Sequence, residues 1–259
     1  MNTLLTTVII SSPIEQFEVS PLMYASGPIL GDIVFALTNF VVYAGLVTTI
    51  VLGLHFMADN NHRLVPSYWS TLVETLYASV YSFSNDQLSS KHIVYFPFVY
   101  ALFITILVTN LVGNIPYGFT LTSTAVMTMG LSFTVFLSVT IIGLVIHKIH
   151  FFSYFVPSGT PIFLVPMLVL IELVSYLARA VSLGVRLAAN MIAGHMLLAI
   201  LASFLYGLFT TSLIIAAVTL VPFAIFTMLI VLELAVSMIQ AYVFCTLVAS
   251  YIKDAQDLH

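Results

Sequence analysis

Charged side chains are scarce in this sequence. Of its 259 residues, 6 are Lys or Arg and 10 are Asp or Glu, or 6% charged, while 61% are hydrophobic and the mean hydropathy is +1.15. Soluble domains carry about 25% charged residues, so this composition excludes an ordinary soluble protein and indicates an integral membrane protein. The formal net charge of −4 is spread thinly and gives no reason to expect nucleic acid as a partner.

Several chemical signatures are missing as well. Cys245 is the single cysteine, so no disulfide can form within the chain. No phosphate-binding loop, metal-ligand spacing or activated-nucleophile motif occurs, so we expect neither a metal nor an organic cofactor. Residues 1–18 lack Lys and Arg, which excludes a typical secretory or import signal and is consistent with a short tail.

Long apolar runs dominate what is present. Five of them occur, at about 33–57, 93–113, 125–147, 161–201 and 206–252. Each is continuous rather than alternating, which argues against a membrane β-barrel and predicts an all-α membrane protein. We expect the whole chain, residues 1–259, to form a single integral membrane domain with five membrane-crossing helices.

The last two runs are longer than one crossing needs. About forty helical residues extend about 60 Å, against a hydrocarbon core of about 30 Å. Each run could fold back on itself, but its interior has no cluster of polar turn residues. We therefore expect residues 161–252 to form a hairpin of two long, strongly tilted helices, with a tilt imposed by packing against a large partner.

A shorter amphipathic segment lies between the first two runs. Residues 66–90 place Trp69, Leu72 and further apolar side chains at helical spacing, with polar side chains opposite. Pro66 suits the first turn of a helix. The pattern predicts a helix that lies on the membrane surface, the alternative being a simple polar loop.

The loop cations all fall on one side of a topology with five crossings. The loops expected at 114–124 and 202–210 have no Lys or Arg. The positive-inside rule makes the cationic side the matrix or cytoplasm, and it places the N-terminus on the opposite side and the C-terminus on the cationic one. Seven crossings would split these cations: Arg63, Lys91, Lys148 and Lys253.

Two arginines stand inside the fourth run, where exposure of one arginine to lipid costs about 2.5–3.5 kcal/mol. At 100° per residue, one stripe of this helix carries Glu172, Arg179, Arg186 and Asn190, with small residues beside them that let another helix approach closely. Glu172 is about 21 Å from Arg186 along the helix, so Arg186 has no obvious acidic partner in the chain. Since arginine keeps its charge in proteins, this stripe points to a site that needs a permanent cation beside another subunit.

The remaining polar residues of the last two runs have two interpretations. Arg179 could pair with a buried acid and only fasten two helices, and the carboxylates and His195 could be satisfied groups that fix helix packing. Taken together, however, they span much of the membrane, where ionisable residues usually mark an ion or proton path. His195 faces away from Arg186 on the fourth run. The candidates on the last run are Glu233, Gln240 and Asp254.

The sequence resembles subunit a of the rotary F-type ATP synthase in three segments: SLGVRLAANMIAGH at 182–195, ELAVSMIQAYVF at 233–244 and NLVGNIPY at 110–117. The arrangement with His195 and Glu233 resembles the mitochondrial branch. SPIEQFE at 12–18 resembles mitochondrial members whose short leader is removed. On this resemblance, residues 1–11 are expected to be a cleaved leader.

The resemblance implies a stator subunit of the proton-transporting ATP synthase in the mitochondrial inner membrane, with its N-terminus toward the intermembrane space and its C-terminus toward the matrix. Its partners would be a ring of c subunits, each with a membrane-buried carboxylate, other membrane and peripheral-stalk subunits, and the lipid bilayer. Protons would enter through one half-channel, ride the ring and leave through another. Arg186 would draw each ring carboxylate into its ionised form and block leakage, and the chain itself would make no ATP.

The helix positions assign the other polar residues to the two half-channels that the resemblance implies. We expect the inlet, from the intermembrane space, to be lined by His195, Glu233, Asn190 and Gln240. We expect the outlet, to the matrix, to be lined by Glu172 and Asp254. A self-contained channel or secondary transporter would need repeats or paired broken helices, of which the sequence has no sign. A purely structural subunit would leave the stripe around Arg186 unexplained.

Overall fold

The computed structural model describes residues 17–27, 33–59, 65–88, 93–115, 118–155, 163–210 and 218–256. The expected leader at 1–11 lies outside these ranges, as do Arg63 and Lys91. The elements, in chain order, are β1 (Pro21–Gly27), β2 (Ile33–Thr38), α2 (Asn39–Ala58), α3 (Tyr68–Leu88), η2 (Ile93–Tyr95), α4 (Phe96–Gly113), η3 (Leu121–Ser123), α5 (Ala125–His147), η4 (Lys148–Phe155), α6 (Val165–Phe209) and α8 (Leu220–Gln256).

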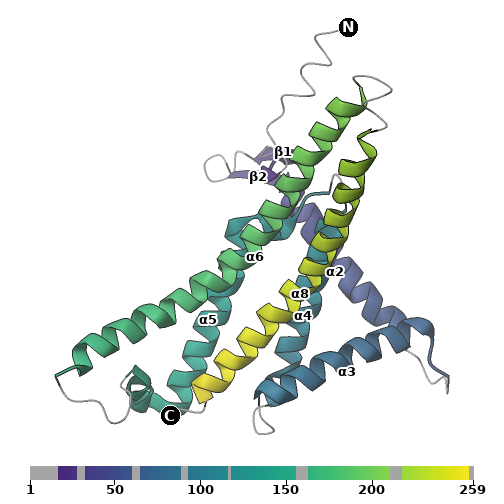
Figure 1. The fold of residues 1–259 in the computed structure, drawn as a ribbon. Helices are drawn as coiled ribbons and strands as arrows, with labels where there is room; N and C mark the ends of the chain where they lie inside the picture. The colour runs from purple at the N-terminus through teal and green to yellow at the C-terminus, as the bar shows by residue number, and fades with distance from the viewer. Residues whose placement is uncertain are drawn as a thin grey trace.

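Five helices of the described residues are long and apolar enough to cross a membrane. They are α2, the Ile93–Gly113 segment that contains α4, the Ala125–Phe151 segment that contains α5, α6 and α8. The expected all-α membrane fold with five crossings is confirmed. Figure 1 shows the C-terminal end of α8 at the lower end of the molecule and the N-terminal end of α2 well above it, below the upper ends of α6 and α8.

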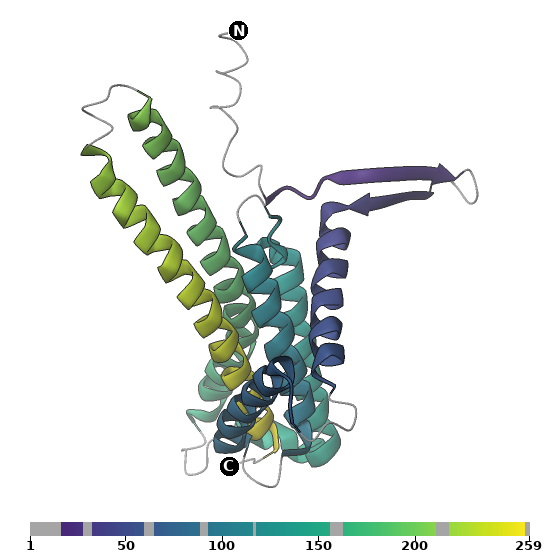
Figure 2. The ribbon, with the colours of Figure 1, turned by 90° about the vertical axis from the view of Figure 1, so that its right-hand side faces the viewer.

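The first apolar run divides into a strand and a helix, so the expectation of helix from residue 33 is wrong for residues 33–38. These residues form β2, which pairs antiparallel with β1. Helix α2 begins at Asn39 because Thr38 caps it, its hydroxyl accepting a long bond of 3.5 Å from the Val41 N–H. The hairpin projects sideways from the start of α2 (Figure 2).

The loop expected at 202–210 is also wrong. Helix α6 continues through these residues to Phe209, and α8 begins at Leu220 rather than near 206. Gly207 is the one weak helix former in this stretch, and a single glycine does not end a helix. Pro222 falls in the first turn of α8, where the missing N–H is tolerated. The connection between the two helices is therefore displaced by several residues.

The two long helices form the expected tilted hairpin. Helix α6 has 45 residues and α8 has 37, which correspond to about 67 Å and 55 Å. Both are inclined to α4 and α5 (Figure 1), and their upper ends lean away from α2, α4 and α5 (Figure 2). The buried residues of α8 run from Ser237 to Gln256, so its C-terminal half anchors the hairpin in the bundle.

The main hydrophobic core lies where α4, α5, α6 and α8 cross, closed from one side by the end of α3. Phe244 and Leu187 are among its largest buried side chains. The core consists of Leu88, Val99, Ile106, Val135, Val139, Leu183, Leu187, Ala241, Phe244, Cys245, Val248, Ala249, Ile252 and Ala255. It holds the lower half of the hairpin against the three shorter helices.

The predicted amphipathic helix is present as α3, which lies across the lower ends of the crossing helices (Figure 1). Its inner face buries Val80, Ser84 and Leu88. The Ser250 hydroxyl of α8 donates a 3.1 Å hydrogen bond to Gln87 Oε1. Trp69, at the other end of α3, is half-exposed, as expected for an anchor at the membrane surface.

Helices α5 and α6 approach closely because position 184 has no side chain. A Cβ atom on Gly184 would lie 3.1 Å from the Met129 Cα and 3.1 Å from the Ser132 Cβ. The Ser132 hydroxyl donates a hydrogen bond to the Ala180 carbonyl one turn earlier. The contact therefore involves backbone on both helices, which cannot yield as a flexible side chain would.

Replacing Gly184 by alanine is expected to force α5 and α6 apart and to destabilise the fold by about 1–3 kcal/mol, as overpacking does. The matched control is Gly130→Ala on α5, where an added Cβ meets nothing within 4 Å. Thermal unfolding of the purified protein in detergent measures the difference. Equal midpoints for the two variants would contradict the close approach.

Candidate functional site

Arg186 lies on an exposed face of α6. Its side chain is exposed, and so are the neighbouring small residues Ala178, Ser182, Ala189 and Ala193. The opposite face of α6 is buried against the bundle. Its buried side chains include Leu183, Leu187 and Met191. Within the described residues no hydrogen bond or ion pair reaches Arg186. The cation thus stands on an open stripe of small side chains.

His195 and Glu233 meet between α6 and α8. His195 Nε2 lies 3.8 Å from Glu233 Oε1, and the two side chains are only 9% and 12% exposed. Neither atom has a hydrogen-bond partner within the described part of the chain. The gap exceeds hydrogen-bond distance by less than 1 Å, so a small side-chain rotation would let a proton pass between them.

Gly194 makes room for this pair. A Cβ atom at position 194 would lie 2.6 Å from Glu233 Oε1 and 3.0 Å from its Cδ. The Glu233 carboxylate therefore rests directly on the α6 backbone beside His195. Any side chain at 194 would push the carboxylate away. Gly194 lies within the segment 182–195 that resembles the family, but a linear sequence does not show that it faces a residue on another helix.

A polar cluster of α4 side chains bonds to α8 next to this pair. It was not predicted from the sequence. Asn110 Nδ2 donates a hydrogen bond of 3.2 Å to the Ser237 carbonyl, and Asn114 Nδ2 donates one of 2.7 Å to the Ser237 hydroxyl. That hydroxyl in turn donates 2.8 Å to the Glu233 carbonyl. The amide oxygens of both asparagines are buried without a hydrogen-bond partner among the described residues. Two asparagines four residues apart in an apolar run were the available signal.

A second ionisable group lies toward the opposite end of α6. Arg179 Nη2 is 3.4 Å from Glu172 Oε1 on the same helix, and Arg179 Nη1 is 3.8 Å from Asp254 Oδ2 on α8. Arg179 thus links the two helices, which is the structural role weighed for it from the sequence. The three side chains are 29–48% exposed, so none of them is fully enclosed by the described chain.

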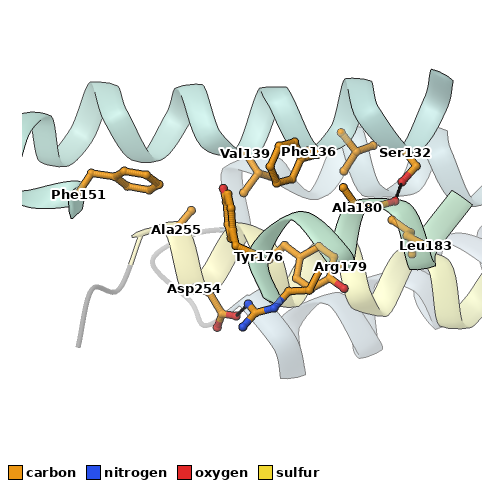
Figure 3. A pocket seen from close by; sticks show the side chains of 12 residues that line it. Ser132, Phe136, Val139, Phe151, Tyr176, Arg179, Ala180, Leu183, Asp254 and Ala255 are labelled. Atoms are coloured by element: carbon orange, nitrogen blue, oxygen red, sulfur yellow. Dashed lines mark hydrogen bonds and ion pairs between the residues drawn. The ribbon is translucent and has the colours of Figure 1, made fainter. Parts of the chain in front are cut away.

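A small pocket with a cavity volume of about 30 Å³ adjoins this second group. Its wall is mostly apolar and comes from α5, η4, α6 and α8, while Arg179 and Asp254 point toward each other at its edge (Figure 3). Tyr176 and Tyr251 add two hydroxyl groups. The Tyr176 hydroxyl is 2.7 Å from the hydroxyl of Thr140 on α5.

Asn190 and Gln240, the two remaining candidates, lie between the ionisable group around His195 and the one around Arg179. Asn190 is half-buried one turn beyond Arg186, and Gln240 is buried on α8. No hydrogen bond joins Gln240 to Arg186, although the two lie near the same level of the hairpin. The structure therefore separates the polar residues into a His195–Glu233 group and an Arg179–Glu172–Asp254 group, about 13 Å and 10 Å from Arg186 along α6.

Comparison with known proteins points to one family. Residues 41–253 match the model of the family described as ATP synthase A chain. ATP synthase subunit a of Mycosarcoma maydis is 55% identical over 251 residues, covering 97% of this chain and 99% of the relative. ATP synthase subunit a of Emericella nidulans is 47% identical, covering 96% and 98%, and that of Podospora anserina is 46% identical over the full length of both chains. With its five crossing helices and this match over nearly all of its length, the chain belongs to the ATP synthase subunit a family.

Proposed function

We propose that this chain translocates protons beside a rotating ring and that Arg186 is the point at which it meets the ring carboxylates. Membership of the family supports the coarser role of a proton-translocating stator subunit in the membrane sector of ATP synthase. The observation that carries the proposal is the exposed Arg186 on its stripe of small residues, with an ionisable group on either side.

The positive charge of Arg186 needs a partner that the described chain does not supply. A guanidinium in a bilayer is stable only beside an anion or water. A carboxylate carried past the stripe by a neighbouring helix satisfies this need in its ionised form. The small side chains at 182 and 189 let that helix approach closely. Arg186 then favours proton loss from each arriving carboxylate and stops protons from crossing directly between the two groups.

The His195–Glu233 group is suited to the inlet. Both side chains can hold a proton, they lie at 3.8 Å, and the α4 asparagines extend the polar surface beyond them. Protons pass along this group to a ring carboxylate on one side of Arg186. Asn190 and Gln240 add polar lining between Glu233 and the ring.

The Glu172–Asp254 group is suited to the outlet. Two carboxylates flank one guanidinium, so the group carries a net negative charge that attracts departing protons. It lies on the opposite side of Arg186 from His195 and is partly open to water. The separation of the groups prevents a proton from crossing the membrane without riding the ring.

The cations support one orientation. Lys148 directly follows α5, whose last residue, His147, contacts Gln256 at the end of α8, and Lys253 lies in the last turn of α8 beside Asp254. The positive-inside rule favours the matrix for this end, which also carries the Glu172–Asp254 group. The His195–Glu233 group then opens to the intermembrane space. The protein is accordingly a multi-pass component of the mitochondrial inner membrane, together with a c-ring and the other subunits of the complex.

Replacing Arg186 by alanine is expected to abolish proton-driven ATP synthesis in an assembled complex. Arg186→Lys is expected to fail largely too, because an ammonium is a compact point charge that can lose its proton when buried. Ser182→Ala, one turn away on the same exposed face, is the matched control and should leave synthesis unchanged. Near-normal synthesis and proton pumping in either arginine variant would contradict the role of Arg186.

Gly194→Ala is expected to displace the Glu233 carboxylate from His195 and to slow proton flow severalfold without loss of assembly. The physical reason is the 2.6 Å that would separate the new Cβ from Glu233 Oε1. Gly207→Ala on the same helix is the control, since an added Cβ there meets nothing within 4 Å. Proton flow through the membrane sector in vesicles measures the effect, and unaltered flow in Gly194→Ala excludes a close Gly194–Glu233 contact.

Sidedness of the two half-channels can be tested with silver ions on single cysteines. Cys245 is buried and is first replaced by alanine. Cysteines at 232 and 234, beside Glu233, are expected to react from the intermembrane space, and cysteines at 171 and 173, beside Glu172, from the matrix. Reaction of each pair from the opposite side would reverse the assignment of inlet and outlet.

A further inference from the structure

The N-terminal part of the chain reaches the inlet through one side chain. Phe17, directly before the strand hairpin, lies with its ring 6.3 Å from that of His195, at an interplanar angle of 75°. This is an edge-to-face arrangement within the 4.5–7 Å range of attractive aromatic pairs. Residue 17 thus contacts the middle of α6, far away in sequence, at one of the residues assigned to the inlet.

The backbone after Phe17 is fastened to the start of the first crossing helix. The Asn39 N–H donates a hydrogen bond of 3.1 Å to the Ser20 carbonyl, and Asn39 Nδ2 donates one of 3.1 Å to the Glu18 carbonyl. Asn39 Oδ1 accepts 2.8 Å from the Phe40 N–H and so holds the amide in this orientation. The segment that carries Phe17 is therefore held at α2 through Glu18 and Ser20, while the Phe17 ring contacts α6.

Among the described residues, no hydrogen bond fixes the orientation of the His195 imidazole. Its Nε2 is buried without a hydrogen-bond partner there and lies 3.8 Å from Glu233 Oε1. A histidine that transfers protons usually has one ring nitrogen held by a hydrogen bond, which sets the orientation of the other. Among the described residues, the restraint on His195 therefore comes from packing, to which the edge-to-face contact with the Phe17 ring contributes.

We propose that Phe17 is a positioning residue of the proton inlet, holding the His195 imidazole toward Glu233. This inference rests on the proposed role of His195 and Glu233. Phe17 itself carries no proton and touches no carboxylate of the ring. It limits rotation of the imidazole through the contact between the two rings.

The test measures proton flow through the assembled complex in vesicles, as a function of pH on the inlet side, normalised to the amount of complex. Phe17→Ala is expected to lower the flow severalfold and to move the midpoint of the pH profile, since the imidazole loses its restraint. Phe17→Leu keeps most of the side-chain volume but not the aromatic ring. Its proton flow is expected to lie between those of the unmodified protein and Phe17→Ala. Leu22→Ala, exposed on the same segment, is the matched control.

A second variant reaches the same contact without touching the ring. Asn39→Asp keeps the oxygen that accepts from Phe40 but removes the donor to the Glu18 carbonyl. The added negative charge is tolerated because it lies at the N-terminus of α2. This variant is expected to move the pH midpoint in the same sense as Phe17→Ala and by less.

His195→Ala separates this inference from the function on which it rests. Normal flow in both His195→Ala and Phe17→Ala overturns the inlet assignment itself. Loss of flow in His195→Ala with an unchanged profile in Phe17→Ala overturns the role of Phe17 alone. A lower flow in Phe17→Ala with an unmoved midpoint would make Phe17 a structural contact only and would equally overturn the proposal.

Discussion

A permanent cation inside a bilayer constrains everything around it. Arg186 cannot be neutralised by losing its proton, and the chain places it on the outer face of α6 instead of pairing it within the bundle. Within the described residues no ion pair neutralises it. Small residues keep its face of the helix open, while the opposite face of α6 is buried against α5 and α8.

The contrast between the two arginines follows from the same constraint. Arg179 lies between the carboxylates of Glu172 and Asp254 and thereby ties α6 to α8. Arg186, seven residues further and only about 20° around the helix, makes no ion pair with a described residue. Two arginines on one stripe of a helix thus have different surroundings within the described part of the chain.

The sequence was sufficient for features that depend on a single helix. Helical periodicity placed Arg186 and His195 on opposite faces of α6, and the structure agrees. It was insufficient where tertiary contacts decide. Residues 33–38 are as apolar as the helix that follows, and only pairing with β1 makes them a strand. The residues after 201 look like a loop beside Gly207, yet nothing there ends α6. Gly194, Ser237 and Phe17 matter through neighbours on other elements, which linear spacing does not reveal.

The two close contacts of α6 also have a mechanical consequence. Gly184 brings the helix against α5, and Gly194 brings it against the Glu233 side chain of α8. Arg186 lies between these two points of support. A sideways force on Arg186 would be resisted firmly at Gly184, where backbone meets backbone, and less at Gly194, where the contact is the end of the flexible Glu233 side chain. The load would therefore pass mainly into α5.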